Sequence, residues 1–230
     1  MNILFISSAT IGVVISLLGY GAGIALKRKL RSGLCNPLLI SIILVMLAMT
    51  VLHINYDSYY SSAKYLSWLL TPATVSLAIP LYVQLETLKR NLRAIVGGVL
   101  AGVLASMGSV FLLARLFGLS HEEYVTLLPK SITTAIGMGV SEELGGYVTI
   151  TVAVIIVTGI LGNIMATFLC HLFRITDPVA KGLAIGTSSH AIGTARAMEL
   201  GQTEGAMSSL AIVVSGLLTV IGASFFASLL

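Results

Sequence analysis

Long apolar runs dominate the chain, and polar residues are confined to short stretches between them. Most of these runs are close to the ~20 residues that an α-helix needs to cross the hydrocarbon core of a bilayer. The pattern therefore predicts an all-α integral membrane protein with about six to eight transmembrane segments. The apolar segments are approximately 3–26, 36–53, 65–85, 94–117, 125–140, 147–172, 178–195 and 206–230.

Three segments, 65–85, 125–146 and 178–201, carry more polar residues, prolines and glycines than the others. A helix that faces lipid cannot leave backbone groups unpaired. We therefore expect these segments to be broken or re-entrant helices that face protein or a water-filled cavity. Their helix-breaking residues are Pro72, Pro80, Pro129, Gly137, Gly139, Gly182, Gly186 and Gly193.

The composition excludes a soluble fold. The chain is 57% hydrophobic and only 10% charged, whereas an ordinary soluble domain carries about 25% charged residues. No polar stretch is longer than a loop, so we expect a single membrane domain over 1–230. The net charge of +4 does not indicate nucleic acid, because the basic residues lie in short loops and no aromatic-rich basic patch accompanies them.

These basic loops predict the orientation in the membrane. Lysine and arginine concentrate in 27–35, 86–93 and 173–181, and the positive-inside rule places such loops in the cytoplasm with the N-terminus outside. To bring 173–181 to the cytoplasmic side, one of the segments between 118 and 172 must fail to cross the membrane. Segment 125–146 is the best candidate for this re-entrant element. We expect 3–26 to be retained as the first span, because its basic residues follow the apolar run, whereas those of a signal peptide precede it.

A short pattern, [Ser/Thr]-x-[Ser/Thr]-x-Ala-Ile-[Pro/Gly]-x5-Glu, occurs three times, beginning at Thr74, Ser131 and Thr187. The first and third copies are separated by about half the chain, which predicts repeat halves of approximately 1–118 and 119–230. Interrupted segments at corresponding places in two halves indicate a transporter with a midplane binding site. The alternative is a chance recurrence in a chain rich in Ala, Ile, Gly, Ser and Thr.

The segment 186–196 carries the densest polar chemistry. Its hydroxyl groups and the freed N–H groups of a helix break could bind an anion, helped by the helix dipole. Arg196 could pair with a carboxylate, and His190 could bind substrate or couple a proton near neutral pH. The alternative is tight helix packing, with Arg196 extended toward an interface. The hydroxyl residues of this segment are Thr187, Ser188, Ser189 and Thr194, and the first three are candidate substrate-binding residues.

A second candidate segment, 128–139, places a lysine at a proline break and hydroxyl groups after it. An ammonium group among hydroxyls suits an anion. Glu142 or Glu143 could carry a coupling proton or cation, or both could lie in solvent at the end of the segment. The candidate substrate-binding residues are Lys130, Ser131, Thr133 and Thr134.

The motifs do not favour an enzyme. The chain has no Gly-x-Ser-x-Gly elbow for a nucleophilic serine and no His-Glu-x-x-His zinc motif, and a serine next to a histidine in sequence is not a catalytic arrangement. We expect no catalytic residue, no metal and no cofactor.

Several motifs, spread over essentially the whole chain, resemble the LrgB/CidB family of bacterial membrane proteins. The long stretch 186–196 is the most specific of them. One departure is Ala135, because a proline is often found there in the family. The motifs lie at 36–38, 80–82, 129–134, 186–196 and 204–211.

The resemblance implies a multi-pass protein of the bacterial plasma membrane and two functional descriptions. One is an antiholin-like regulator of murein hydrolase activity and lysis that works with a small LrgA/CidA-like partner. The other is a carrier of small monocarboxylates, such as pyruvate in bacteria or glycolate and glycerate in a plastid relative. A bulk hole-former needs neither duplicated broken helices nor a buried His190 and Arg196, so the residues favour an alternating-access carrier. We also expect contacts with membrane lipid and a homo-oligomer, and no nucleic acid.

Overall fold

The computed structural model describes residues 10–30, 36–76 and 78–230. Every regular element in these ranges is an α-helix, which confirms the predicted all-α class. The chain divides into two compact units, Met1–Ser76 and Leu77–Leu230. The start of the predicted first segment and part of the basic loop 27–35 lie outside the described residues.

In the first unit, α2 packs against α3 and α4. The helix α3 begins where predicted, because the Asn36 side chain accepts a hydrogen bond from the Leu38 N–H at 2.8 Å and Pro37 suits the first helical position. A side chain at Gly23 would collide with the backbone of Pro37, so this glycine lets the two helices approach closely. The helices are α2 (Ile11–Leu30), α3 (Pro37–Val51), α4 (Tyr56–Ala63), α5 (Tyr65–Trp68) and α6 (Leu70–Ser76).

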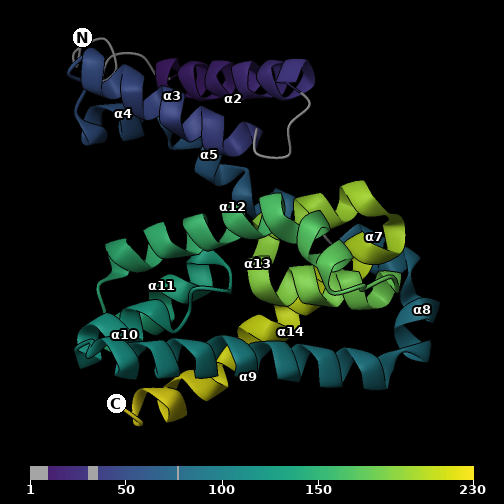
Figure 1. Ribbon diagram of the computed structural model, residues 1–230. Coiled ribbons are helices and arrows are strands. Elements are labelled where there is room, and N and C mark those ends of the chain that lie inside the picture. The colour runs from purple at the N-terminus through teal and green to yellow at the C-terminus, as the bar shows by residue number, and fades with distance from the viewer. Residues whose placement is uncertain (1–9, 31–35, 77) are drawn as a thin grey trace. The chain divides into compact units, whose positions relative to one another are not determined.

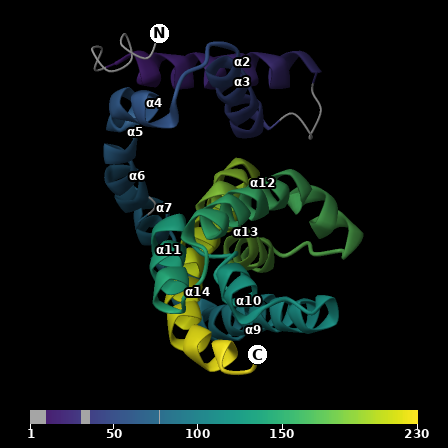
Figure 2. The ribbon, with the colours of Figure 1, turned by 90° about the vertical axis from the view of Figure 1, so that its left-hand side faces the viewer.

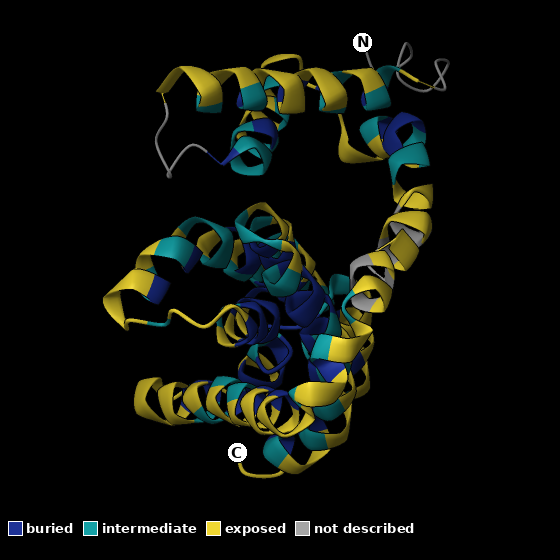
Figure 3. Ribbon diagram, turned by 90° about the vertical axis from the view of Figure 1, so that its right-hand side faces the viewer, coloured by how far each residue is buried: buried dark blue, intermediate teal, exposed yellow. Residues whose placement is uncertain are grey.

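The second unit is built around α13, which lies between α12 and α9 and packs most extensively against α14 (Figure 1, Figure 2). Gly182 and Gly186 face α14 so closely that neither position has room for a methyl group. Buried positions gather where α12, α13 and α14 meet (Figure 3). The helices are α7 (Ala78–Val83), α8 (Leu85–Arg90), α9 (Leu92–Phe117), α10 (His121–Leu127), α11 (Thr134–Glu143), α12 (Val148–Leu172), α13 (Pro178–Leu200) and α14 (Gln202–Ala227).

Four helices, α2, α9, α12 and α14, are long and apolar enough to cross a membrane. The surface of α14 carries an exposed apolar stripe: Val213, Leu217 and Ile221 follow one another at intervals of four and are each more than 60% exposed. These observations support a membrane protein with several spans. Since α3 has only 15 residues and 65–85 is divided into short helices, the expected six to eight crossings stay a prediction.

Interrupted helices occur in all three segments that the sequence marks as unusual. The segment 65–85 forms short pieces, from α5 to the start of α8. In the second segment, α10 and α11 are separated by residues 128–133. In the third, α13 is broken at His190, whose φ of 41° and ψ of −141° lie outside the helical region.

Two copies of the repeated motif lie at these breaks. In the second copy, Ala135 lies in the first turn of α11, just after the break. In the third copy, Ala191 follows the break in α13 directly. Both segments reach the same residue of α12: a side chain at Gly137 would collide with the Ile155 side chain, and His190 contacts the Ile155 carbonyl. Several side chains of the first copy lie outside the described residues, and the organisation in two repeats stays a prediction.

Candidate functional site

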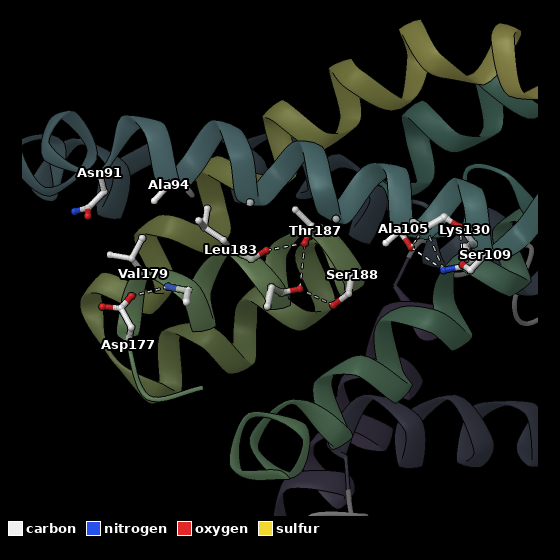
Figure 4. A pocket seen from close by; sticks show the side chains of 16 residues that line it. Asn91, Ala94, Ala105, Ser109, Lys130, Asp177, Val179, Leu183, Thr187 and Ser188 are labelled. Carbon is white, nitrogen blue, oxygen red and sulfur yellow. Dashed lines mark hydrogen bonds between the residues drawn. The ribbon is translucent and has the colours of Figure 1, made fainter. Parts of the chain in front are cut away.

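A cavity of about 750 Å³ in the second unit lies between α9 and the first half of α13 (Figure 4). It brings together Lys130 and Ser131 from one predicted segment with Thr187 and Ser188 from the other. We call it the Lys130 cavity. The remaining lining residues are Asn91, Ala94, Gly98, Gly102, Ala105, Ser106, Ser109, Asp177, Val179, Ala180, Leu183 and Ala184.

The cavity exists because the facing surface of α9 consists of small residues. Its lining positions recur at intervals of three or four, so they form one face of the helix. At Gly102 the two helices touch, since an added Cβ would lie 2.9 Å from the Thr187 hydroxyl oxygen. Gly98 approaches Leu183 in the same way, at 3.3 Å. These two glycines set the separation of α9 and α13.

The positively charged group of the cavity is the Lys130 ammonium, and Asp177, before the first turn of α13, is the acidic residue of the lining. The turn between α10 and α11 fixes the backbone of Lys130. The Lys130 N–H donates to the Leu127 carbonyl at 3.2 Å, and the next residue, Ser131, is buried. The Lys130 Nζ donates to the hydroxyl oxygens of Ser131 at 3.0 Å and Ser106 at 3.3 Å. Within the described residues no carboxylate pairs with it, so a half-buried positive charge is held by neutral groups alone.

On the opposite wall, the hydroxyls of α13 bond to their own helix. Thr187 donates to the Leu183 carbonyl at 2.7 Å, and Ser188 donates to the Ala184 carbonyl at 2.8 Å. Their oxygens still offer lone pairs, and a hydroxyl can rotate toward a ligand. The part of this wall around Thr187 and Ser188 is therefore polar and uncharged, and it leads to the break at His190.

His190 stabilises the break and is not among the residues that line the cavity. Its Nε2 lies 3.0 Å from the Ile155 carbonyl oxygen, which can only accept, so Nε2 carries the proton. The second half of α13 is held by two further bonds: Asn163 donates to the Ile192 carbonyl at 2.8 Å, and Thr194 donates to the His190 carbonyl at 2.9 Å. These contacts favour packing over ligand binding for His190, and its coupling role stays a prediction.

Comparison with known proteins adds the family. The family model described as the LrgB-like family matches residues 16–229. The chain belongs to this family. It is 36% identical to "Antiholin-like protein LrgB" of Bacillus cereus (strain B4264) and of Bacillus anthracis (strain A0248), in each case over 91% of this chain and 92% of the relative. No solved structure matches the chain.

Arg196 lies outside the Lys130 cavity of this LrgB-like chain, although the sequence analysis predicts that both Arg196 and Lys130 bind the substrate anion. Its guanidinium donates to the Thr167 hydroxyl of α12 and forms an ion pair with Glu199. The side chain is 31% exposed. The expected direct role of Arg196 in anion binding stays a prediction, because here the guanidinium already has a carboxylate partner.

The other predicted residues also lie away from the cavity lining. Thr133 is the N-cap residue of α11 and Thr134 the first residue of that helix, and both are half-buried. Ser189 is buried against α12, where Gly162 leaves room for its side chain. Glu142 and Glu143 are exposed at the C-terminal end of α11, and their coupling role stays a prediction.

Sequence reasoning missed Ser106 and Ser109, which face the cavity from the middle of α9. Both serines lie in an apolar segment in which no proline or neighbouring charge indicates a binding site. The available signal was periodicity, because Gly98, Gly102, Ser106 and Ser109 lie on one face at intervals of three or four. Asn91 and Asp177 line the cavity from the predicted loops 86–93 and 173–181, which the sequence analysis used only to predict the orientation in the membrane.

Proposed function

We propose that this chain acts as an antiholin-like membrane protein, a regulator of murein hydrolase activity and cell lysis. The observation that carries this proposal is the similarity to antiholin-like LrgB proteins over 91% of the chain. The four long apolar helices agree with a function inside a membrane. We expect the site of action to be the bacterial plasma membrane.

A second candidate function is a carrier for a small monocarboxylate such as pyruvate. The observation that favours it is the Lys130 cavity, where an ammonium group has only hydroxyl partners. A monocarboxylate would supply the missing negative charge, and charge-assisted hydrogen bonds are roughly twice as strong as neutral ones. The volume of about 750 Å³ leaves room for such an anion together with water.

The broken helix gives the carrier a plausible way to move its substrate. Discontinuous helices that meet at a binding site are typical of alternating-access transporters. In this chain the break at His190 follows the cavity residues Thr187 and Ser188, with only Ser189 between them. The two candidate functions are compatible, because altered flux of a metabolite changes membrane energetics and so could influence lysis. In both proposals we expect the chain to work with an LrgA/CidA-like membrane partner.

Uptake of labelled pyruvate, lactate and glycolate into proteoliposomes tests the carrier, with and without an LrgA-like partner. The variant is Lys130→Met, and the matched control is Arg115→Gln, which removes one exposed positive charge from α9 outside the cavity lining. Saturable uptake that is lost only in Lys130→Met supports the carrier. If properly folded protein takes up none of these acids, the carrier proposal fails.

Lysis of cells that express the chain tests the regulator. An antiholin-like protein should delay lysis and lower murein hydrolase activity relative to cells with an empty vector. Unchanged lysis in cells that hold the protein in their membrane would contradict this function. If Lys130→Met abolishes both uptake and the lysis effect, one site serves both functions.

A further inference from the structure

A second cavity, about 390 Å³, lies where α12 ends and α13 begins, and it shares no lining residue with the Lys130 cavity. Three basic side chains line it, His171, Arg174 and Lys181, together with the hydroxyl-bearing Thr167 and Thr176. We call it the basic pocket. Its lining contains no carboxylate, so the local charge is positive.

The backbone at Arg174 supports a functional role for this side chain. The Ile175 N–H bonds to the Cys170 carbonyl at 2.8 Å and the Arg174 N–H to the His171 carbonyl at 3.1 Å. These two bonds form a Schellman motif, in which Arg174 occupies the position that glycine usually takes. Its φ is +54°, a left-handed conformation that disfavours a residue with a Cβ. An arginine at such a position suggests that its side chain is needed there.

Among the described residues, the acidic side chains next to the basic pocket in sequence, Asp177 and Glu199, have other partners. In the described part of the chain, neither Arg174 nor Lys181 forms an ion pair. The nearby Asp177 accepts a hydrogen bond from the Ala180 N–H as the N-cap of α13, and it lines the other cavity. Arg196 touches Thr167 from the α13 side but is paired with Glu199, so it adds no net charge.

We propose that the basic pocket binds a phosphate group. Guanidinium and ammonium groups, together with hydroxyl donors, are the side chains that bind phosphate in proteins. The pocket lies at the end of the candidate span α12, the level at which lipid headgroups meet a membrane protein. The phosphate could therefore belong to an anionic lipid headgroup or be free in solution. This site is independent of the proposed substrate cavity.

The test uses the purified full chain in phosphatidylcholine nanodiscs. One arm titrates inorganic phosphate against chloride at equal ionic strength and follows the thermal midpoint. The other arm replaces part of the phosphatidylcholine with phosphatidylglycerol and measures retained lipid by native mass spectrometry. Stabilisation by phosphate in the first arm identifies free phosphate, retention of phosphatidylglycerol alone identifies the headgroup, and both together support the shared phosphate chemistry.

Two variants separate binding from folding. Arg174→Gly removes the guanidinium and also suits the left-handed backbone, so the protein should stay at least as stable thermally while binding weakens at least tenfold. Lys181→Met should weaken binding comparably, and Arg115→Gln should leave it unchanged. The proposal is overturned if neither phosphate nor phosphatidylglycerol has an effect beyond chloride and phosphatidylcholine, or if both variants bind as well as the unmodified protein.

Discussion

The Lys130 ammonium lies 3.3 Å from the hydroxyl oxygen of Ser106, a residue in the middle of α9. This contact joins the turn between α10 and α11 to the small-residue face of α9 and closes one end of the cavity. Ser131 completes the arrangement, since its hydroxyl lies 3.0 Å from both the ammonium and Ser106. A positive charge held in this way is available to an anion.

Removing the Lys130 charge should leave the fold intact. A half-buried ammonium without a carboxylate partner is partly desolvated, and this disfavours its charged form. Lys130→Met keeps most of the length of the side chain and removes the charge, so we expect a thermal midpoint equal to or above that of the unmodified protein. A large drop in the midpoint would show that the ammonium is structural.

Gly102 should tolerate no side chain, because an added Cβ would lie 2.9 Å from the Thr187 hydroxyl oxygen. We expect Gly102→Ala to force α9 and α13 apart and to cost about 1–3 kcal/mol of folding free energy. Gly97→Ala is the matched control on the same helix, since no atom lies within 4 Å of its added Cβ. The control should be neutral or stabilising by about 0.5–1 kcal/mol. Reversible unfolding in mixed detergent measures the folding free energy of both variants. Equal changes in the two variants would refute the close contact at Gly102.

The break in α13 should be strained at His190, whose φ is +41°. His190→Ala and His190→Gly both remove the ring and its bond to the Ile155 carbonyl. Only glycine suits the left-handed backbone, so the alanine variant should be less stable than the glycine variant by about 1 kcal/mol. The same unfolding measurement compares them. Greater stability of the alanine variant would mean that the segment is a regular helix in solution.

The helical segments could be predicted from the sequence because apolar runs of ~20 residues have few alternatives in a membrane. The break near His190 was also predictable, since glycines and polar residues gather there. The positions of Arg196 and Ser106 were not. The chain changes direction at His190, so Arg196 contacts Thr167 of α12 while Thr187 faces α9. Ser106 belongs to the site only because α9 packs against α13, a tertiary contact that no local pattern reveals.

Equilibrium binding of labelled pyruvate to the purified full chain tests the central claim about the candidate site, that the Lys130 cavity binds a small carboxylate. A hydrogen bond to a charged group contributes about 1.5–3 kcal/mol, so Lys130→Met should weaken saturable binding by roughly 10- to 100-fold, while Arg115→Gln binds as the unmodified protein does. Equal binding by Lys130→Met and the unmodified protein, or no saturable binding of pyruvate, lactate or glycolate by the unmodified protein, would contradict the claim.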